Sequence, residues 1–176
     1  MNHPDQNTQF ISLKIALLTV SDSRTLETDT SGQYLYDSCL AAGHQVVARQ
    51  IVSDDRYLLR AAISQCIADP TIQVVVSTGG TGLTGRDVTP EAVMPLFDKE
   101  IEGFGELFRS LSWQEIGSST IQSRALAGIA NATLIFCLPG STGACRTGWS
   151  QILQNQLDSR FTPCNFASLL PRLKER

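Results

Sequence analysis

The sequence predicts an α/β fold: a three-layer α/β/α sandwich built on one doubly wound, mostly parallel but mixed sheet. Three observations support this prediction. Short, continuously apolar runs alternate with amphipathic segments of helical length, and loops rich in glycine, serine and aspartate follow the apolar runs. The chain has 176 residues, the usual size of one domain. Alternating strands and helices favour a parallel sheet with right-handed crossovers.

Four segments are expected to form strands. Residues 14–20 (KIALLTV), 72–77 (IQVVVS) and 132–138 (ATLIFCL) are apolar at consecutive positions, which is typical of strands covered on both faces. Residues 44–52 (HQVVARQIV) alternate only in part. This fourth segment predicts a weaker strand, nearer an edge of the sheet.

Helical patterns fall between these strands. Residues 30–42 and 54–68 carry apolar side chains at helical spacing, and Gly43 ends the first of them. A further helix is expected over 141–157. Residues 98–131 mix helix and turn signals and receive no assignment. We expect one domain over 13–170, a flexible segment at 1–12 and a tail at 171–176.

A helix is also expected directly after the stretch STGGTGLTGRD at 77–87. Thr89 has the chemistry of an N-cap, Pro90 suits the first helical position, and Glu91 places an acid in the first turn. The positive end of this helix would then face the glycine-rich stretch.

Composition limits the possible partners. A net charge of -3 and a pI near 5.3 give no overall basic footprint for a nucleic acid and leave only a local basic patch open. Five scattered cysteines lack zinc-binding or disulfide spacing. The N-terminus lacks a signal-peptide pattern, and no apolar run is long enough to cross a bilayer. We therefore expect a cytoplasmic protein that binds neither nucleic acid nor membrane.

Four polar loops follow predicted strands, at 21–24 (SDSR), 53–55 (SDD), 77–87 and 139–145 (PGSTGAC). Because the carboxyl ends of parallel strands meet at one edge of a sheet, these loops are expected to converge there. Taken singly, each loop is as well explained by turn formation or helix capping. Their convergence favours a polar cleft that accepts anions.

The loop at 77–87 has the composition of a phosphate cradle, because glycines let consecutive N–H groups approach one anion. It is neither a Walker P-loop nor the G-x-G-x-x-G fingerprint. A surface loop whose glycines only make turns is the alternative. Asp87 and Asp54 either stabilise helix starts or hold Mg²⁺ against phosphates, and Arg86 either pairs with Asp87 or binds phosphate.

The stretches STGGTGLTGRDVTPEA, EIEGFGELFR, IQSRALAGIAN and LIFCLPGS resemble the molybdenum cofactor biosynthesis family that includes MoaB, MogA and a domain of gephyrin. The resemblance covers nearly the whole chain, and PGSTGACRTGW is closest to the MoaB branch. It implies a MogA-like fold that binds molybdopterin and transfers AMP from Mg-ATP to the terminal phosphate of the pterin. It also implies a homotrimer or homohexamer and possible contacts with other enzymes of the pathway.

Carried over by motif, the resemblance implies that Asp87 and Asp54 are catalytic and hold Mg²⁺. The residues expected to bind substrate or phosphate are Ser21, Asp22, Thr78, Gly79, Gly80, Thr81, Gly82, Arg86, Ser123, Pro139, Gly140 and Ser141. Transferase members typically carry PGNP where this chain has PGST at 139–142. A non-catalytic pterin-binding or scaffold protein of the same pathway is therefore the alternative.

Overall fold

A computed structural model describes residues 8–175 and contains one six-stranded mixed sheet in the order β2-β1-β3-β6-β5-β4. The first four strands of this order are parallel, and the last two are antiparallel to their neighbours. The strands are β1 (Lys14–Val20), β2 (Gln45–Val52), β3 (Val74–Thr78), β4 (Lys99–Glu100), β5 (Leu126–Ala130) and β6 (Thr133–Leu138). The predicted fold class is confirmed, and β2 is an edge strand as expected.

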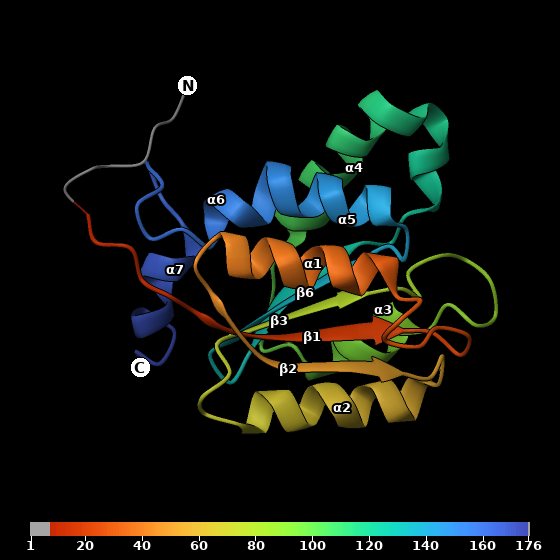
Figure 1. Cartoon of the computed structure of the whole chain (residues 1–176), viewed down its shortest axis with the longest axis horizontal. Helices are drawn as coiled ribbons and strands as arrows, with labels where there is room; N and C mark the ends of the chain where they lie inside the picture. Colours follow the sequence, from red (N-terminus) through yellow and green to blue (C-terminus); the bar gives the residue numbers. More distant parts are fainter. Residues whose placement is uncertain (1–7, 176) are drawn as a thin grey trace.

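Helices cover both faces of the sheet (Figure 1). One face carries α1 (Thr30–Ala41), α4 (Glu102–Ile116) and α5 (Thr142–Gly148), and the other carries α2 (Arg56–Ala68) and α3 (Thr89–Val93). Alternate strand residues divide between two apolar cores: Leu17 and Val76 lie in one, Leu18 and Val75 in the other. The consecutive apolar residues of the central strands therefore follow from the burial of both faces.

The unassigned region at 98–131 contains β4, α4, a 3₁₀ segment η2 (Gly117–Gln122) and β5. Helix α4 buries Phe104 and Phe108 against the first core. It also exposes Leu107 and Trp113, so its apolar pattern does not mark a single face. The structure places this helix beside α5, above the antiparallel part of the sheet (Figure 1).

Two helix predictions need correction. Thr89 is the first residue of α3 and not its N-cap, which is Val88, and the helix spans only five residues before the 3₁₀ segment η1 (Met94–Leu96). A helix this short has only a small macrodipole, so the positive end expected to face the glycine-rich stretch is weak. The helix expected over 141–157 is continuous but changes type, from α5 to a π-helical turn η3 (Trp149–Leu153) and then α6 (Gln154–Gln156).

The first and last described segments of the chain lie at the end of the sheet opposite the loop edge (Figure 1). Residues 1–7 of the expected flexible segment lie outside the described residues. Within its remainder, the Ser159 hydroxyl donates to the Gln9 carbonyl at 2.9 Å, and Ser12 Oγ donates to the Gly43 carbonyl at 2.7 Å. The last elements are α7 (Phe166–Leu169) and η4 (Leu170–Arg172). None of the helices in 8–175 has the length and apolar character that crossing a bilayer requires.

Candidate functional site

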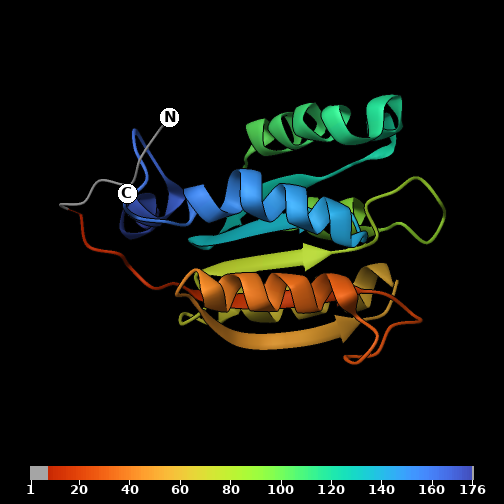
Figure 2. The same cartoon turned by 45° about the horizontal axis from the view of Figure 1, so that its top comes forward.

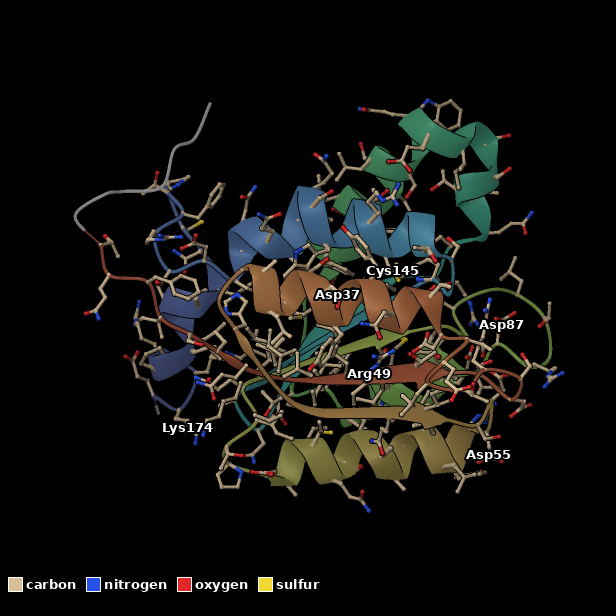
Figure 3. All side chains as sticks on the ribbon, in the orientation of Figure 1. Asp37, Arg49, Asp55, Asp87, Cys145 and Lys174 are labelled. Atoms are coloured by element: carbon tan, nitrogen blue, oxygen red, sulfur yellow. The ribbon has the colours of Figure 1, made fainter. Side chains whose placement is uncertain are left out.

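The loops that follow β1, β2, β3 and β6 emerge at one edge of the sheet, where the long loop after β3 projects beyond the strand ends (Figure 2). Asp87 lies at this edge, and Lys174 lies at the opposite end of the molecule (Figure 3). A cavity of about 530 Å³ opens between three of these loops, α4 and α5. That size suits a small organic ligand.

Most of the predicted site residues line this cavity. Eleven of the fourteen do so: Ser21, Thr78, Gly79, Gly80, Thr81, Gly82, Asp87, Ser123, Pro139, Gly140 and Ser141. Asp22, Asp54 and Arg86 are not among its lining residues. The structure therefore brings the loops after β1, β3 and β6 together around one space, and leaves the three remaining residues beside it.

The glycine loop begins with a backbone conformation that requires glycine. Gly79 has a φ of +108°, and a Cβ there would lie 2.3 Å from the Val20 carbonyl oxygen. Thr89, fully buried, donates from Oγ1 to the Gly79 carbonyl at 2.8 Å. A Cβ on Gly140 would lie 3.2 Å from Gly79 Cα, so the loops after β3 and β6 touch through bare backbone.

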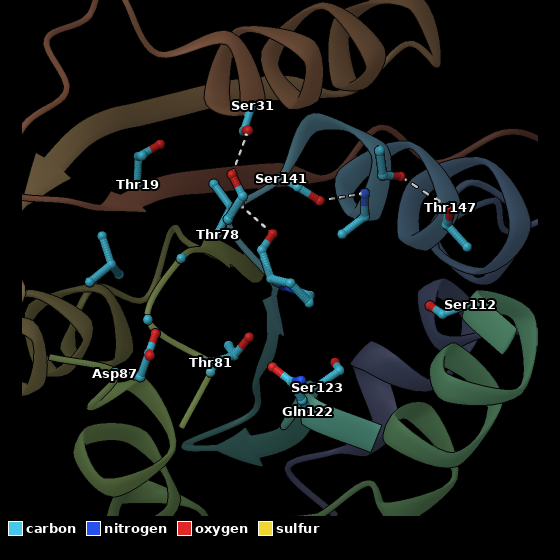
Figure 4. Close-up of a pocket in the computed structure, with 18 of the residues that line it drawn as sticks. Thr19, Ser31, Thr78, Thr81, Asp87, Ser112, Gln122, Ser123, Ser141 and Thr147 are labelled. Carbon is cyan, nitrogen blue, oxygen red and sulfur yellow. Dashed lines mark hydrogen bonds between the residues drawn. The ribbon is translucent and has the colours of Figure 1, made fainter. Parts of the chain in front are cut away.

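Asp87 is held in the wall of the cavity as a carboxylate (Figure 4). Its Oδ2 accepts from the Thr84 amide at 2.9 Å and from the Thr84 hydroxyl at 2.7 Å. Burial alone would raise the pKa of Asp87, but these bonds, a bond from the Gly82 amide and the charge of Arg124 lower it below its ordinary 3.8. Asp87 is therefore ionised near neutral pH.

Asp22, Asp54 and Arg86 form a separate cluster. The Asp54 amide donates to Asp22 Oδ1 at 3.0 Å, and the Asp22 amide donates to Asp54 Oδ2 at 3.2 Å. The Arg86 guanidinium contacts Asp22 and lies 3.7 Å from Asp54 Oδ2. A hydrogen bond from Ser53, with those from the Asp54 amide and Arg86, lowers the pKa of Asp22. In this structure Arg86 pairs with Asp22 and Asp54 and not with Asp87, the carboxylate that the sequence suggested as its partner.

The loop after β6 leads into α5 through a capped turn. Ser141 is the N-cap of α5 and accepts from the Ala144 amide at 3.1 Å. Thr78 Oγ1 donates to the Pro139 carbonyl at 2.9 Å, and Ser31 Oγ donates to the Gly140 carbonyl at 2.8 Å (Figure 4). The end of β3 and the start of α1 thus fix the position of this loop at the cavity.

Sequence reasoning missed two parts of the cavity. Arg24, the last residue of the SDSR loop, is the one cationic side chain among the lining residues. Its Nη1 donates to the Thr28 carbonyl at 2.7 Å. The second part is a wall contributed by α4 and η2, whose lining residues are Phe108, Ser112, Glu115, Ile116, Ser119 and Gln122. A helix assigned within 98–131 would have pointed to this wall, but the sequence analysis left that region unassigned.

The carboxylates limit the kind of metal that the site can hold. Asp29, Asp87 and Glu115 line the cavity, and Asp29 is engaged by Thr19 and Arg49. Within 8–175, no group of three or more His, Cys, Asp or Glu side chains is arranged to hold a metal ion. A single carboxylate at Asp87 fits Mg²⁺ that arrives with a polyphosphate, because Mg²⁺ commonly takes one or two carboxylates and completes its shell with phosphate oxygens and water.

Comparison with known proteins identifies the family. A family model described as "Probable molybdopterin binding domain" matches residues 16–159. The chain belongs to this family. Molybdenum cofactor biosynthesis protein B of Escherichia coli (strain K12) is 59% identical over 169 residues, covering 96% of this chain and 98% of the relative. The protein B of Bacillus subtilis (strain 168) is 42% identical over 146 residues, covering 82% and 86%.

Solved structures of molybdenum and tungsten cofactor proteins share this fold. A crystal structure of molybdenum cofactor biosynthesis protein B is 40% identical, has a TM-score of 0.85, and covers 94% of this chain and 98% of its own. The tungsten cofactor synthesizing protein MoaB from Pyrococcus furiosus is 38% identical with a TM-score of 0.73, covering 82% and 92%. The predicted resemblance to the MoaB branch is confirmed.

Proposed function

We propose that this chain binds molybdopterin and transfers AMP from ATP to the terminal phosphate of the pterin. One observation carries the proposal: the glycine loop Gly79–Gly82, the carboxylate of Asp87 and the capped turn at Ser141 line the same cavity. Backbone N–H groups of such loops bind phosphate. The family description supports molybdopterin as the ligand.

The proposed reaction needs no nucleophile from the protein. An oxygen of the pterin phosphate attacks the α-phosphorus of ATP, a new P–O bond forms, and pyrophosphate leaves with the electrons of the broken bond. The lining residues include no His, Cys or Lys, and burial raises the pKa of the nearby Cys145 thiol to about 11. The protein's contribution is to position two phosphates and to stabilise their charge.

Asp87 would hold Mg²⁺ in this proposal. When bound, Mg²⁺ supplies positive charge that neutralises the phosphates and polarises the P–O bonds. Arg24 would bind phosphate oxygens, because it is the cation among the lining residues and the other charged lining residues are carboxylates. The predicted role of Asp54 at the metal requires that Arg86 release it, because the two lie 3.7 Å apart in an ion pair.

The position of Asp54 favours one second candidate, a pterin-binding or scaffold protein without chemistry. The resemblance implies that both aspartates serve AMP transfer, and only Asp87 lines the cavity. A binding protein needs the cradle and the pterin subsite but no second carboxylate. This candidate predicts pterin binding without an ATP-dependent product.

The test is AMP transfer with purified protein, molybdopterin, ATP and Mg²⁺. Asp87→Asn is expected to lower kcat by about 10²- to 10³-fold, the usual cost of losing one group that stabilises transition-state charge. Asp37→Asn is the matched control, because Asp37 is exposed on α1 and lies outside the cavity lining. Undiminished turnover of the Asp87 variant would overturn the transferase assignment. Bound pterin without product in the wild type would support the second candidate.

The proposal includes the remaining predictions about the protein's setting. It places the reaction in the cytoplasm, with a homotrimer or homohexamer as the working unit and other enzymes of molybdenum cofactor synthesis as possible partners. Sedimentation of the purified chain checks the oligomeric state. A monomer that transfers AMP at the full rate would remove the oligomer from the proposal.

A further inference from the structure

Residues 8–13, here called the N-terminal strap, lie at the end of the domain opposite the cavity (Figures 1 and 3). Ser159 Oγ accepts from the Ile11 amide at 2.9 Å and donates to the Gln9 carbonyl at 2.9 Å. Ser12 Oγ donates to the Gly43 carbonyl at 2.7 Å. Most residues of the strap are exposed. The strap can therefore separate from the domain at a smaller free-energy cost than the central strands can.

The strap packs against the buried imidazole of His44. The centroid of the Phe10 ring lies 5.3 Å from that of His44, and the Trp149 ring contacts the imidazole at 6.5 Å. The Leu13 amide donates to His44 Nδ1 at 3.2 Å. The Leu13 carbonyl accepts from the Gln45 amide at 2.9 Å, which joins the end of the strap to β2. The hydrogen bond to Nδ1 is therefore the contact of the strap that depends on the protonation state of His44.

This hydrogen bond requires a neutral imidazole. A backbone N–H can only donate, so Nδ1 is the unprotonated ring nitrogen and Nε2 carries the proton. Within 8–175, Nε2 of His44 has no hydrogen-bond partner. Protonation would place a second N–H opposite the Leu13 amide, donor against donor, and would leave a buried cation without an acceptor at either ring nitrogen. The docked strap and a charged His44 are therefore incompatible.

The charged groups near His44 come from the turn after α6. The charge of Asp158 favours the protonated imidazole, but burial outweighs it and lowers the pKa of His44 below its ordinary 6.5. Arg160 is paired with the same carboxylate, with its Nε and Nη2 at 2.9 and 2.8 Å from the two oxygens. Lys14 of β1 acts on Asp69 instead. Once the strap leaves, water and Asp158 can stabilise the charged imidazole.

We propose that protonation of His44 releases the N-terminal strap, so that mild acidification frees residues 8–12 while the rest of the domain stays folded. Leu13 serves as the hinge, because its side chain is fully buried and its carbonyl is bonded to β2. A histidine that fastens a segment only when neutral is a recurring basis of pH sensing. This inference is independent of the proposed function, since the cavity lies at the other end of the sheet.

Amide hydrogen exchange of the full chain tests the release, with rates corrected for the pH dependence of chemical exchange. Between about pH 7.5 and 5, protection of the Ile11 and Leu13 amides is expected to fall by up to about tenfold per pH unit below 6.5, the limit for coupling to one proton. The Val76 amide in β3 should keep its protection. Unchanged protection in the strap, or an equal loss in β3, would overturn the inference.

Three variants assign the effect to His44. His44→Asn keeps an acceptor for the Leu13 amide without titrating, so protection of the strap should become independent of pH. Ser159→Ala is the matched comparison: it removes two hydrogen bonds of the strap, and should lower protection at every pH while retaining the wild-type pH dependence. Asp158→Asn should move the loss of protection to lower pH. Wild-type pH dependence in His44→Asn, or its absence in Ser159→Ala, would contradict the proposal.

Discussion

Arg124 donates from Nε to the carbonyl oxygen of Gly82 at 2.8 Å. Its Nη2 donates to the Asp87 carbonyl at 2.9 Å, and its Nη1 contacts Glu91. One planar guanidinium therefore holds both ends of the segment 82–87, which contains the Thr84 contacts to the Asp87 carboxylate. The position of Asp87 in the cavity depends on a residue that follows η2, some forty positions later in the chain.

Arg124→Gln is therefore expected to lower kcat/KM for AMP transfer by about 10- to 100-fold, because small displacements of a positioning group are costly. Amide hydrogen exchange in 81–87 should become faster. Arg60→Gln is the control: Arg60 also donates to backbone carbonyls, those of Ala92 and Glu91 at 3.1 and 2.8 Å, but not within the loop. Equal losses of kcat/KM in the two variants would show that the contacts of Arg124 with the loop have no specific role.

Gly79→Ala is expected to reduce both stability and ligand binding. Its φ of +108° is unfavourable for alanine, and the added Cβ would meet the Val20 carbonyl oxygen at 2.3 Å. Strain at one such position costs on the order of 1–3 kcal/mol. Urea denaturation measures the change in the free energy of unfolding.

Gly85→Ala provides the comparison within the same loop. A Cβ on Gly85 meets no atom within 4 Å, and its φ is outside the positive range. This variant should unfold at the wild-type urea midpoint and bind ligand normally. Destabilisation of both variants to the same degree would show that the loop, rather than the Gly79 conformation, is sensitive to substitution.

The strands β1, β3 and β6 were predictable because burial on both faces leaves an unbroken apolar run. Strand β5 was not, because its sequence LAGIA has little β-preference, even though its partner β6 follows after only Asn131 and Ala132. A Cβ on Gly128 would lie 2.4 Å from the Phe97 ring, a close approach that no local pattern reveals. Helix α4 was obscured by exposed Leu107, Trp113 and Ile116.

Convergence of the loops was predictable from parallel strands, but the contact partners of each loop side chain were not. Asp22 and Asp54 differ little from Asp87 in local sequence, since each follows a strand in a polar loop. Their contacts with Arg86 join three loops, and only the assembled sheet edge brings those loops together. The catalytic and metal roles of Asp87 and Asp54 stay predictions.

Arg24→Gln is expected to raise the KM for ATP by about tenfold, since hydrogen bonds between charged groups contribute about 1.5–3 kcal/mol when they are not screened. Arg24 is the cation that lines the cavity and makes no ion pair within 8–175. Arg86→Gln is the matched comparison and should change the KM less. A larger effect at Arg86 would restore the sequence-based assignment of phosphate binding to that residue.

His44 is buried at 4% exposure in a largely apolar setting. Its Nδ1 accepts from the Leu13 amide at 3.2 Å, its ring contacts Phe10 and Trp149, and its Nε2 has no hydrogen-bond partner. Burial lowers the pKa of His44 below its ordinary 6.5, although the charge of Asp158 opposes this shift. As the pH falls, the imidazole of His44 is therefore protonated in the unfolded chain at a higher pH than in the folded chain.

The free energy of unfolding should accordingly be greatest above pH 6.5 and fall as the pH drops below 6.5 toward the lowered pKa of folded His44, with a slope of at most about 1.4 kcal/mol per pH unit. The lowered carboxylate pKa values act in a separate window, below about pH 4. His44→Asn retains an acceptor for Leu13 and removes the titration, so the loss of stability just below pH 6.5 should disappear. His3→Asn removes the other imidazole of the chain and should retain the wild-type profile. A slope that disappears with His3 rather than with His44 would contradict the assignment.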